Sequence, residues 1–345
     1  MKHTNRLFQA LTNLVGTQAV TVDLGSSFTR VAVGSKIVYN EPTCIALHTD
    51  SGAVLAIGQQ ALRLLGKTSN SVQVSFPVAR GVISNSDYAT EFLTAVLKNI
   101  FTDQSLGRQL FGVSALVGMS PSSSPIQKKF LELVLDQSGF GQKMFISQSE
   151  VLYQQLASDN NNTVTILDIG GQKTSCSIFA GGELVSSTTI PIGGVDFTEA
   201  IQVHFRNEYK GLIGWHSAEA AKKDLEILTK GSRARTEKKI SLRTKDIVSQ
   251  TSKTVVVSST AFQEPLFKIA TEIAEFIELF LGRLPTELVT SVLETGIYLT
   301  GGTSAFPGLQ ATFAELLHTN MFPSQRPQLD CIEGLQRLQT LKFKG

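Results

Sequence analysis

The sequence reads AVTVDLGSS over residues 19–27 and returns to the same pattern, VTILDIGG, over residues 164–171. In both places an apolar run rich in β-branched residues, which favours a strand, ends in Asp, an apolar residue and Gly. A second apolar run, a glycine turn and a third apolar run follow in both copies. The repeat therefore predicts two similarly folded domains that face each other, each built around a meander of three strands.

Each Asp-apolar-Gly turn has the chemistry of a phosphate site. An Asp at a strand end stands on a rigid element, and the Gly and small residues after it let backbone N–H groups approach an anion. One such turn is more often an ordinary hairpin, but two in matched contexts favour a polyphosphate gripped by both. The carboxylates of Asp23 and Asp168 are then expected to hold Mg²⁺ through water.

A third glycine-rich stretch reads ETGIYLTGGTS over residues 294–304. It predicts a strand that runs into a glycine turn, with a helix over residues 310–317. The adjacent Gly301 and Gly302 permit close approach of a flat ring or a phosphate. The sequence has neither a GxxxxGK[ST] phosphate loop nor the protein-kinase motifs, so these classes of nucleotide-binding protein are excluded.

The composition narrows the function classes further. A chain of 345 residues suits about two domains. Its charged fraction of 17% lies below the ~25% typical of globular proteins, which favours extensive contacts with partners. With 31 basic and 29 acidic residues the net charge is +2. A protein dedicated to nucleic-acid binding usually carries a much larger positive charge. Three widely spaced cysteines indicate neither zinc nor disulfides and favour a reducing cytoplasm, and no apolar run is long enough to span a membrane.

Residues 4–15 form an amphipathic pattern. The apolar members share one helical face: Leu7, Phe8, Leu11, Leu14 and Val15. Polar residues inside this run disfavour a secretory signal peptide. Two interpretations remain. The segment is either a helix packed on its own domain or a poorly ordered end, or it is a helix lying in a membrane interface. In the second case each half-inserted side chain contributes about 1 kcal/mol, which gives reversible anchoring.

In this order, DLGSS, DIGGQKT and LTGGTSAFPGL resemble the actin/Hsp70/sugar-kinase superfamily, and within it the MreB-type bacterial actins that organise rod shape. Further matches are NEP at residues 40–42, PVARGVI at 77–83, IGGVD at 192–196 and EPL at 264–266. The resemblance runs from about residue 19 to about residue 334. It implies an α/β, actin-like (ribonuclease H-like) fold of two domains. Each domain is expected to hold a mixed sheet with helices and a smaller insert, with a nucleotide cleft between the domains.

The resemblance also implies how the chain is divided. The expected parts are an amphipathic membrane-binding helix at residues 1–17, domain I at residues 18–146 and 318–345 with an insert at about 36–76, and domain II at residues 147–317 with an insert at about 183–250.

By position, three glycine turns match the family's ATP–Mg site. The implied nucleotide-binding residues are Asp23, Gly25, Ser26 and Ser27 in the first phosphate loop, Asp168, Gly170 and Gly171 in the second, and Gly301, Gly302 and Thr303 in the adenosine loop. Lys222 and Asp224 fall where the family places Lys and Glu beside the nucleoside, although a solvated helix face is the simpler interpretation of this pair. The resemblance favours ATP over GTP.

Departures from the family pattern leave hydrolysis open. Gln148 stands where a Glu normally helps to activate the attacking water, and a Gln can orient water but cannot act as a base. In GGQKT, at residues 170–174, Lys173 replaces the Thr that is expected to assist the water. Thr174 is kept, and the resemblance implies Gln148 and Thr174 as the catalytic residues. Lys173 can neutralise phosphate charge or point to solvent. The segment after Cys331 lacks the usual glycine-rich helix start. We therefore expect ATP binding and, if the chain is active, a weak ATPase coupled to filament dynamics.

The resemblance further implies membrane binding, through the N-terminal helix and through a hydrophobic loop before a core strand, where Leu110 and Phe111 stand. The alternative is that these two residues begin the strand that ends at Met119. The implied function is a filament protein on the inner face of the cytoplasmic membrane that organises cell-wall synthesis and cell shape. Its expected partners are further copies of the chain, the membrane surface and cell-wall synthesis or membrane-anchored proteins, without nucleic acid. The alternatives are a membrane adaptor of the FtsA/PilM type with little ATPase activity and, less favoured, a small-molecule kinase of the same superfamily.

Overall fold

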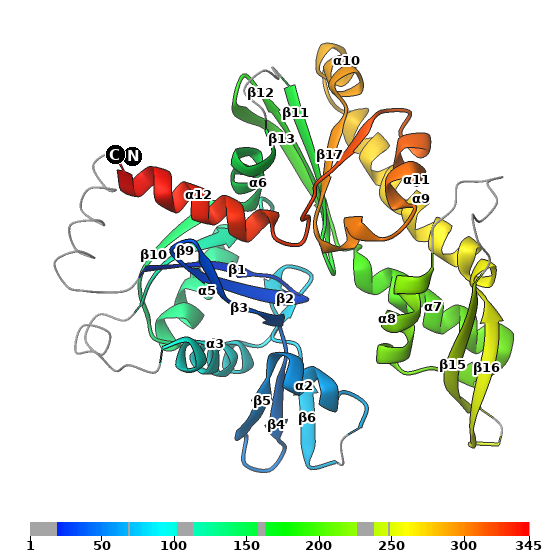
Figure 1. Cartoon of the computed structure of the whole chain (residues 1–345). Helices are drawn as coiled ribbons and strands as arrows, with labels where there is room; N and C mark the ends of the chain where they lie inside the picture. The colour runs from blue at the N-terminus through cyan, green and yellow to red at the C-terminus, as the bar shows by residue number, and fades with distance from the viewer. Residues whose placement is uncertain are drawn as a thin grey trace. The chain divides into compact units, whose positions relative to one another are not determined.

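The computed structural model describes residues 19–67, 70–101, 113–157, 163–225, 238–247 and 249–344. The chain divides into two compact units, residues 1–157 with 329–345 and residues 158–328. Figure 1 shows the elements of both units. The residues expected to contact a membrane lie outside the described residues: Leu7, Phe8, Leu11, Leu14, Leu110 and Phe111.

The central sheet of the first unit has five strands, β1 (Ala19–Leu24), β2 (Phe28–Val33), β3 (Lys36–Pro42), β9 (Val113–Met119) and β10 (Phe140–Ser147). Their order is β10-β9-β1-β2-β3. β1, β2 and β3 form an antiparallel meander, while β9 is parallel to both β1 and β10. The first Asp-apolar-Gly turn therefore closes the β1–β2 hairpin at the middle of the sheet.

The central sheet of the second unit has the same topology. Its strands are β11 (Thr163–Ile169), β12 (Thr174–Ala180), β13 (Glu183–Ile190), β17 (Ile297–Thr300) and β18 (Met321–Pro323), in the order β13-β12-β11-β17-β18. Again three strands form an antiparallel meander and two more add in parallel to the first strand of the meander. The internal duplication predicted from the sequence is thus confirmed, and so is the α/β class with a mixed sheet in each unit.

Helices cover both faces of the first sheet, because successive side chains of a strand point to opposite faces and both sets include apolar residues. Val20 and Val22 of β1 pack with α3 (Ser86–Ile100) and α5 (Pro125–Gln137) in one apolar cluster. On the opposite face, Leu116 of β9 packs with α6 (Gln148–Leu156) and α12 (Asp330–Lys344), which contact each other (Figure 1). Asp23 alternates with Val22, so it lies on the face that α6 and α12 cover.

The helices of the second unit are α7 (Gly194–Tyr209), α8 (Trp215–Asp224), α9 (Gln263–Leu281), α10 (Thr286–Thr295) and α11 (Leu309–Leu316), with 3-10 turns at Ser259–Phe262 and Gly302–Ala305. They share one apolar cluster with the sheet. In α9 the buried residues Leu266, Ala270, Ile273 and Ile277 recur at helical spacing, so one stripe of the helix faces the core. Within the described residues, no helix combines the length and apolarity needed to cross a membrane.

A smaller sheet accompanies each central sheet. In the first unit it comprises β4 (Ile45–His48), β5 (Val54–Ile57) and β6 (Val72–Ser75), next to α2 (Gly58–Leu64), and a two-stranded pair follows, β7 (Val78–Ala79) and β8 (Val82–Ile83). In the second unit it comprises β14 (Gly211–Leu212), β15 (Lys239–Asp246) and β16 (Ser252–Ser258). Two stretches that the sequence assigned to the inserts, β3 and β13, are strands of the central sheets.

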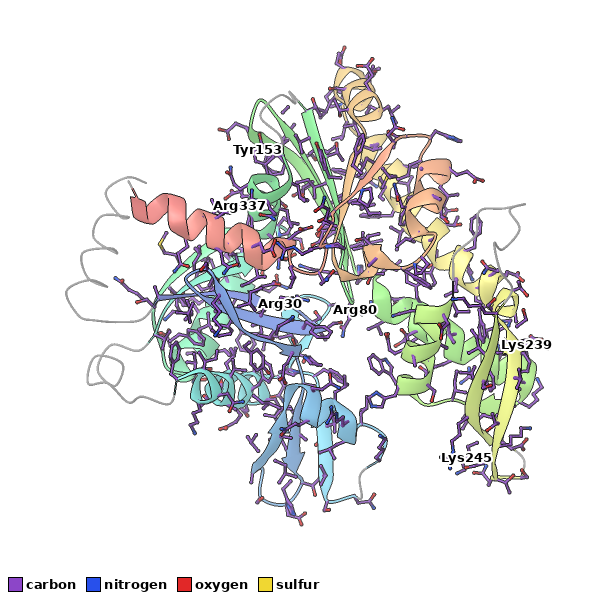
Figure 2. The ribbon with its side chains drawn as sticks, viewed as in Figure 1. Arg30, Arg80, Tyr153, Lys239, Lys245 and Arg337 are labelled. Carbon is purple, nitrogen blue, oxygen red and sulfur yellow. The ribbon has the colours of Figure 1, made fainter. Side chains whose placement is uncertain are left out.

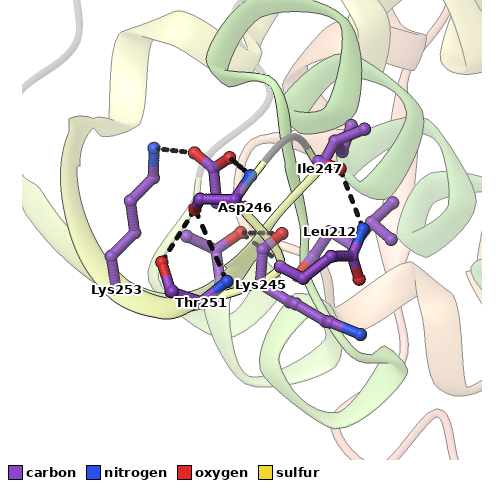
Figure 3. Close-up of polar contacts among 9 residues, drawn as sticks. Leu212, Lys245, Asp246, Ile247, Thr251 and Lys253 are labelled. Atoms are coloured by element: carbon purple, nitrogen blue, oxygen red, sulfur yellow. Dashed lines mark hydrogen bonds and ion pairs between the residues drawn. The ribbon is translucent and has the colours of Figure 1, made fainter.

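The β15–β16 hairpin is closed by Asp246 (Figure 3). Its Oδ2 pairs with Lys253 Nζ at 2.5 Å, and its N–H donates to the Thr251 carbonyl oxygen at 2.9 Å. The N–H of Ile247 in turn donates to the carbonyl oxygen of Lys210 at 3.2 Å, which ties the hairpin end to the end of α7. The end of the second small sheet is therefore stabilised by backbone hydrogen bonds and by an ion pair.

Candidate functional site

The first phosphate turn joins β1 to β2 and is closed by one backbone hydrogen bond. Gly25 N–H donates to the carbonyl oxygen of Phe28 at 3.0 Å. A Cβ at Gly25 would stand 2.7 Å from that oxygen, so the chain turns this tightly only with Gly. Thr43 braces the turn, because its Oγ1 donates to the Gly25 carbonyl at 2.7 Å and its N–H donates to the Ser27 carbonyl at 3.0 Å.

The amides of this turn fit an anion. Among the described residues, the N–H groups of Ser26 and Ser27 donate to no protein acceptor. The Ser26 hydroxyl has a separate task, since its Oγ accepts a hydrogen bond from Gly81 N–H at 2.8 Å. Neighbouring unpaired amides on a rigid turn are the groups that bind phosphate oxygens. The turn therefore presents two neighbouring amide donors without a protein acceptor among the described residues, and the phosphate loop stays a prediction.

Asp23 is the penultimate residue of β1 and is 5% exposed, and each of its carboxylate oxygens contacts a donor. Its Oδ2 pairs with Arg30 Nη1 at 3.3 Å across the β1–β2 hairpin. Arg30 is labelled in Figure 2. Oδ1 of Asp23 accepts a hydrogen bond from Gln148 Nε2 at 3.4 Å. Gln148 is the first residue of α6 and passes Gly118, the β9 neighbour of Asp23, where a Cβ would lie 3.5 Å from Gln148 Cγ. The structure thus brings Gln148 to Asp23 and adds Arg30.

The second phosphate turn joins β11 to β12 and repeats the first. Gly170 N–H donates to the carbonyl oxygen of Lys173 at 2.9 Å, the same three-residue closure that Gly25 makes with Phe28. Asp168 stands at the position of Asp23 and is half-buried. The two turns are therefore equivalent in backbone as well as in sequence.

The start of α7 fixes the second turn. Gly194 N–H donates to the Gly170 carbonyl at 3.0 Å, and Val195 N–H to the Gly171 carbonyl at 2.7 Å. A Cβ at Gly193 would lie 2.7 Å from the Gly170 carbonyl oxygen, so helix and turn come this close only through Gly. The first amides of α7 are thus used to hold the phosphate turn in shape.

The third glycine turn packs directly on the second. Gly301 has φ +85°, and a Cβ there would stand 2.3 Å from Asp168 Oδ1. Thr303 Oγ1 donates to the Gly170 carbonyl at 2.8 Å. Gly302 is exposed, and the nearest atom to a Cβ there would be Gln328 Cβ at 3.9 Å. The structure therefore gathers the second and third predicted turns into one cluster, with Gly302 on its surface.

Lys222 joins this cluster and Asp224 does not. Lys222 Nζ donates to the Gly194 carbonyl at 2.9 Å and to Thr198 Oγ1 at 2.8 Å, and it pairs with Glu219 at 2.6 Å. The Asp224 side chain is 63% exposed, with Lys238 Nζ at 4.0 Å. Of the pair that the resemblance singled out, only Lys222 is held next to the phosphate turn, through the backbone of α7.

Thr174 begins β12 and is 1% exposed. Its Oγ1 donates to the Ile192 carbonyl at 2.7 Å, so its proton is committed to the loop that leads into α7. The hydroxyl oxygen retains acceptor capacity. The sequence assigns Thr174 to catalysis, and the structure gives its hydroxyl a bracing contact within the second unit.

The described residues contain no group of three or more His, Cys, Asp or Glu side chains that could hold a metal ion. A Mg²⁺ at these turns would therefore take most of its ligands from water and phosphate, with carboxylates behind them. This is how Mg²⁺ commonly binds alongside nucleotides, so the residues present fit such an ion.

Sequence reasoning gave no role to three residues of the site. Arg30 lies opposite Asp23 in the β1–β2 register, a relation that hairpin pairing could have suggested. Gly193 and Gly194 appear in the sequence as an adjacent pair before a helix, which is a signal of close backbone approach. Their partner, Gly170, is distant in sequence, so only the folded chain identifies the contact.

Comparison with known proteins gives a consistent result. A family model described as "MreB/Mbl protein" matches residues 17–342. The cell shape-determining protein Mbl of Bacillus subtilis is 29% identical over 320 residues, which cover 91% of this chain and 92% of the relative.

Solved structures with the same fold include two that confirm the predicted actin-like class. MreB 5 of Spiroplasma citri, in a crystal structure with AMPPNP bound, has a TM-score of 0.86 at 23% identity and covers 95% of this chain and 97% of its own. The MamK double helical filament has a TM-score of 0.75 at 20% identity, with coverages of 93% and 99%.

Proposed function

The chain belongs to the MreB/Mbl protein family, and on this premise we propose that it is a membrane-associated actin-like protein. In this proposal it binds ATP–Mg and polymerises into filaments that organise cell-wall synthesis and cell shape. The observation that carries the proposal is the pair of equivalent turns at Gly25 and Gly170, closed by the same hydrogen bond in two sheets of the same topology. An anion site duplicated in this way suits the phosphate chain of a nucleotide.

For the nucleotide, we assign the phosphates to the Ser26 and Ser27 amides and to the turn at Gly170 and Gly171. The structurally similar MreB 5 was crystallised with AMPPNP, which supports the same ligand class for this chain. Gly301 and Thr303 pack on the second turn, and we assign them to the nucleoside that follows the phosphates. Lys222 acts in this proposal by holding the start of α7 against the turn.

For the metal, Asp23 and Asp168 would hold Mg²⁺ through water, and the ion would neutralise phosphate charge. Gln148, anchored on Asp23, would orient the water that attacks the terminal phosphate. Because a Gln cannot take a proton, we propose slow hydrolysis that tunes filament lifetime.

For assembly, we propose head-to-tail association of copies of this chain, since contacts that do not close on themselves generate filaments. The MamK filament, which shares the fold, supports this mode. Membrane association would rest on the apolar face of residues 4–15 and on Leu110 and Phe111, with the protein on the cytoplasmic side. Cell-wall synthesis proteins or their membrane anchors are the proposed partners, as the cell shape-determining relative suggests.

The first experiment is co-sedimentation of the full chain with anionic liposomes, with and without Mg-ATP, followed by negative-stain imaging of the pellet. Filaments on lipid that depend on nucleotide would support the proposal. Lipid binding without filaments under any nucleotide would favour a membrane adaptor of the FtsA/PilM type instead.

Two variants separate the parts of the proposal. Asp168→Ala should abolish metal-dependent nucleotide binding, whereas Asp50→Ala, at an exposed turn, should not. Phe8→Glu should weaken liposome binding, whereas Gln9→Glu adds the same charge on the polar face and should weaken it much less. Unchanged behaviour of Asp168→Ala or of Phe8→Glu would remove the corresponding assignment.

A further inference from the structure

The ion pair of Asp23 and Arg30 is the most buried charged contact of the first phosphate turn. The side chains are 7% and 12% exposed, and Arg30 Nη1 lies 3.3 Å from Asp23 Oδ2. The turn residues 25–27 connect the two strands that carry this pair. A largely buried guanidinium on the strand after the turn is therefore fixed by the carboxylate on the strand before it.

Arg30 keeps donors that the protein does not use. Its Nε is buried and has no hydrogen-bond partner among the described residues. A guanidinium has five N–H donors in a planar fork, which matches phosphate oxygens. The guanidinium also lies over the ring of Phe28, 5.4 Å from the centroid, and Phe28 is the residue whose carbonyl closes the turn. Asp23 thus engages Nη1 and Phe28 packs on the face of the guanidinium, while Nη2 donates to no acceptor of the described residues.

The internal duplication provides a comparison within the chain. The residue opposite Asp168 in the equivalent hairpin is Ser175, which carries no charge. In the second turn the cation is Lys173, which takes the place of Phe28 in the turn closure. The second hairpin thus carries a serine at the register position that Arg30 holds in the first.

We propose that Arg30 binds the phosphate chain of the nucleotide through the N–H groups that Asp23 leaves free, so that part of the affinity is independent of Mg²⁺. This inference rests on the proposed nucleotide binding. A lone Asp23 carboxylate would repel phosphate unless a cation screened it. Arg30 supplies that charge permanently, and its hydrogen bonds to phosphate are charge-assisted.

The test is calorimetric titration of the full chain with ADP and with adenosine, each in Mg²⁺ and in EDTA. In EDTA the wild-type chain should bind ADP about tenfold or more tightly than adenosine, since charge-assisted hydrogen bonds persist without metal. If EDTA removes the advantage of ADP over adenosine, the proposal is overturned. If ADP fails to bind even with Mg²⁺, both the proposed function and this inference fail.

Variants identify the residue responsible. Arg30→Met should lower ADP affinity in EDTA by about tenfold and adenosine affinity by less than about twofold. Arg63→Met, at an exposed position in the last turn of α2, removes the same charge and should leave both affinities unchanged. An ADP affinity in Arg30→Met equal to that of wild type would overturn the assignment.

Removal of Arg30 leaves Asp23 unpaired, so the fold of Arg30→Met is checked by circular dichroism. Arg30→Lys keeps the charge and serves if Arg30→Met is unfolded. Because a lysine offers a point charge without the fork, this variant should retain part of the metal-independent ADP affinity and lose the rest. Full retention in Arg30→Lys would assign the effect to charge without a hydrogen-bonding fork, contrary to the proposal.

Discussion

Gln148 donates from Nε2 to Asp23 Oδ1 over 3.4 Å, although 125 residues separate the two in the chain. The contact links the first residue of α6 to the end of β1, next to Gly118 of β9. Gln148, which stands where the resemblance predicts a Glu near the attacking water, is therefore anchored to the carboxylate of Asp23.

We predict that Gln148→Ala lowers ATP turnover at least about tenfold while ATP affinity stays within about threefold, because orienting the water affects the transition state more than binding. Phosphate release and calorimetry measure the two quantities. Gln60→Ala, at an exposed position of α2, is the matched control and should change neither. Undiminished turnover in Gln148→Ala would place water orientation elsewhere.

Gly301 and its neighbour should respond very differently to the same substitution. Gly301→Ala places a Cβ 2.3 Å from Asp168 Oδ1 at φ +85°, and we expect a loss of at least about 2 kcal/mol in unfolding free energy, together with weaker ATP binding. Gly302→Ala meets its nearest atom only at 3.9 Å and should stay within about 0.5 kcal/mol of wild type. Urea unfolding compares the two, and equal midpoints would contradict this packing.

Thr174→Val should destabilise the chain by about 1–2 kcal/mol, because it leaves the Ile192 carbonyl without the hydrogen bond that it now accepts at 2.7 Å. Thr174→Ser keeps the hydroxyl and should recover most of that loss. Urea midpoints report the difference. A Val variant as stable as wild type would show that the hydroxyl contributes no bracing.

The buried thiols should make the fold sensitive to alkali. Burial raises the pKa of both Cys44 and Cys176 from 9.0 to about 12, with Glu41 adding to the shift at Cys44. The unfolded chain then loses these protons before the folded chain does, so stability is full below pH 9 and falls as the pH rises from 9 towards 12.

At pH 10 each thiol should cost about 1 kcal/mol of unfolding free energy relative to pH 8. Cys176→Ala removes one of these groups, so its stability should fall by about 1 kcal/mol less between these two pH values than that of wild type. Denaturant unfolding at both pH values measures the two losses. The same loss in both proteins would contradict the assignment of Cys176 to the alkaline transition.

The local features of the site were open to prediction from residue order. A strand-end Asp followed by Gly is a pattern of a few neighbouring residues, so the turns at Gly25 and Gly170 could be identified without any distant contact. The sheet membership of Lys36–Pro42 and Glu183–Ile190 could not be predicted in this way, because the sequence of a strand does not determine which sheet it joins. Backbone pairing with β2 and β12 assigned them to the central sheets.

By itself the sequence determined the duplication and the three glycine turns at Gly25, Gly170 and Gly301, because strand periodicity and glycine turns are encoded within short segments. The tertiary structure alone decided which groups meet: Arg30 and Gln148 at Asp23, Gly301 against Asp168, and the start of α7 against Gly170. These contacts join elements far apart in the chain or across a hairpin. They follow from sheet register and close packing, which are properties of the folded chain as a whole.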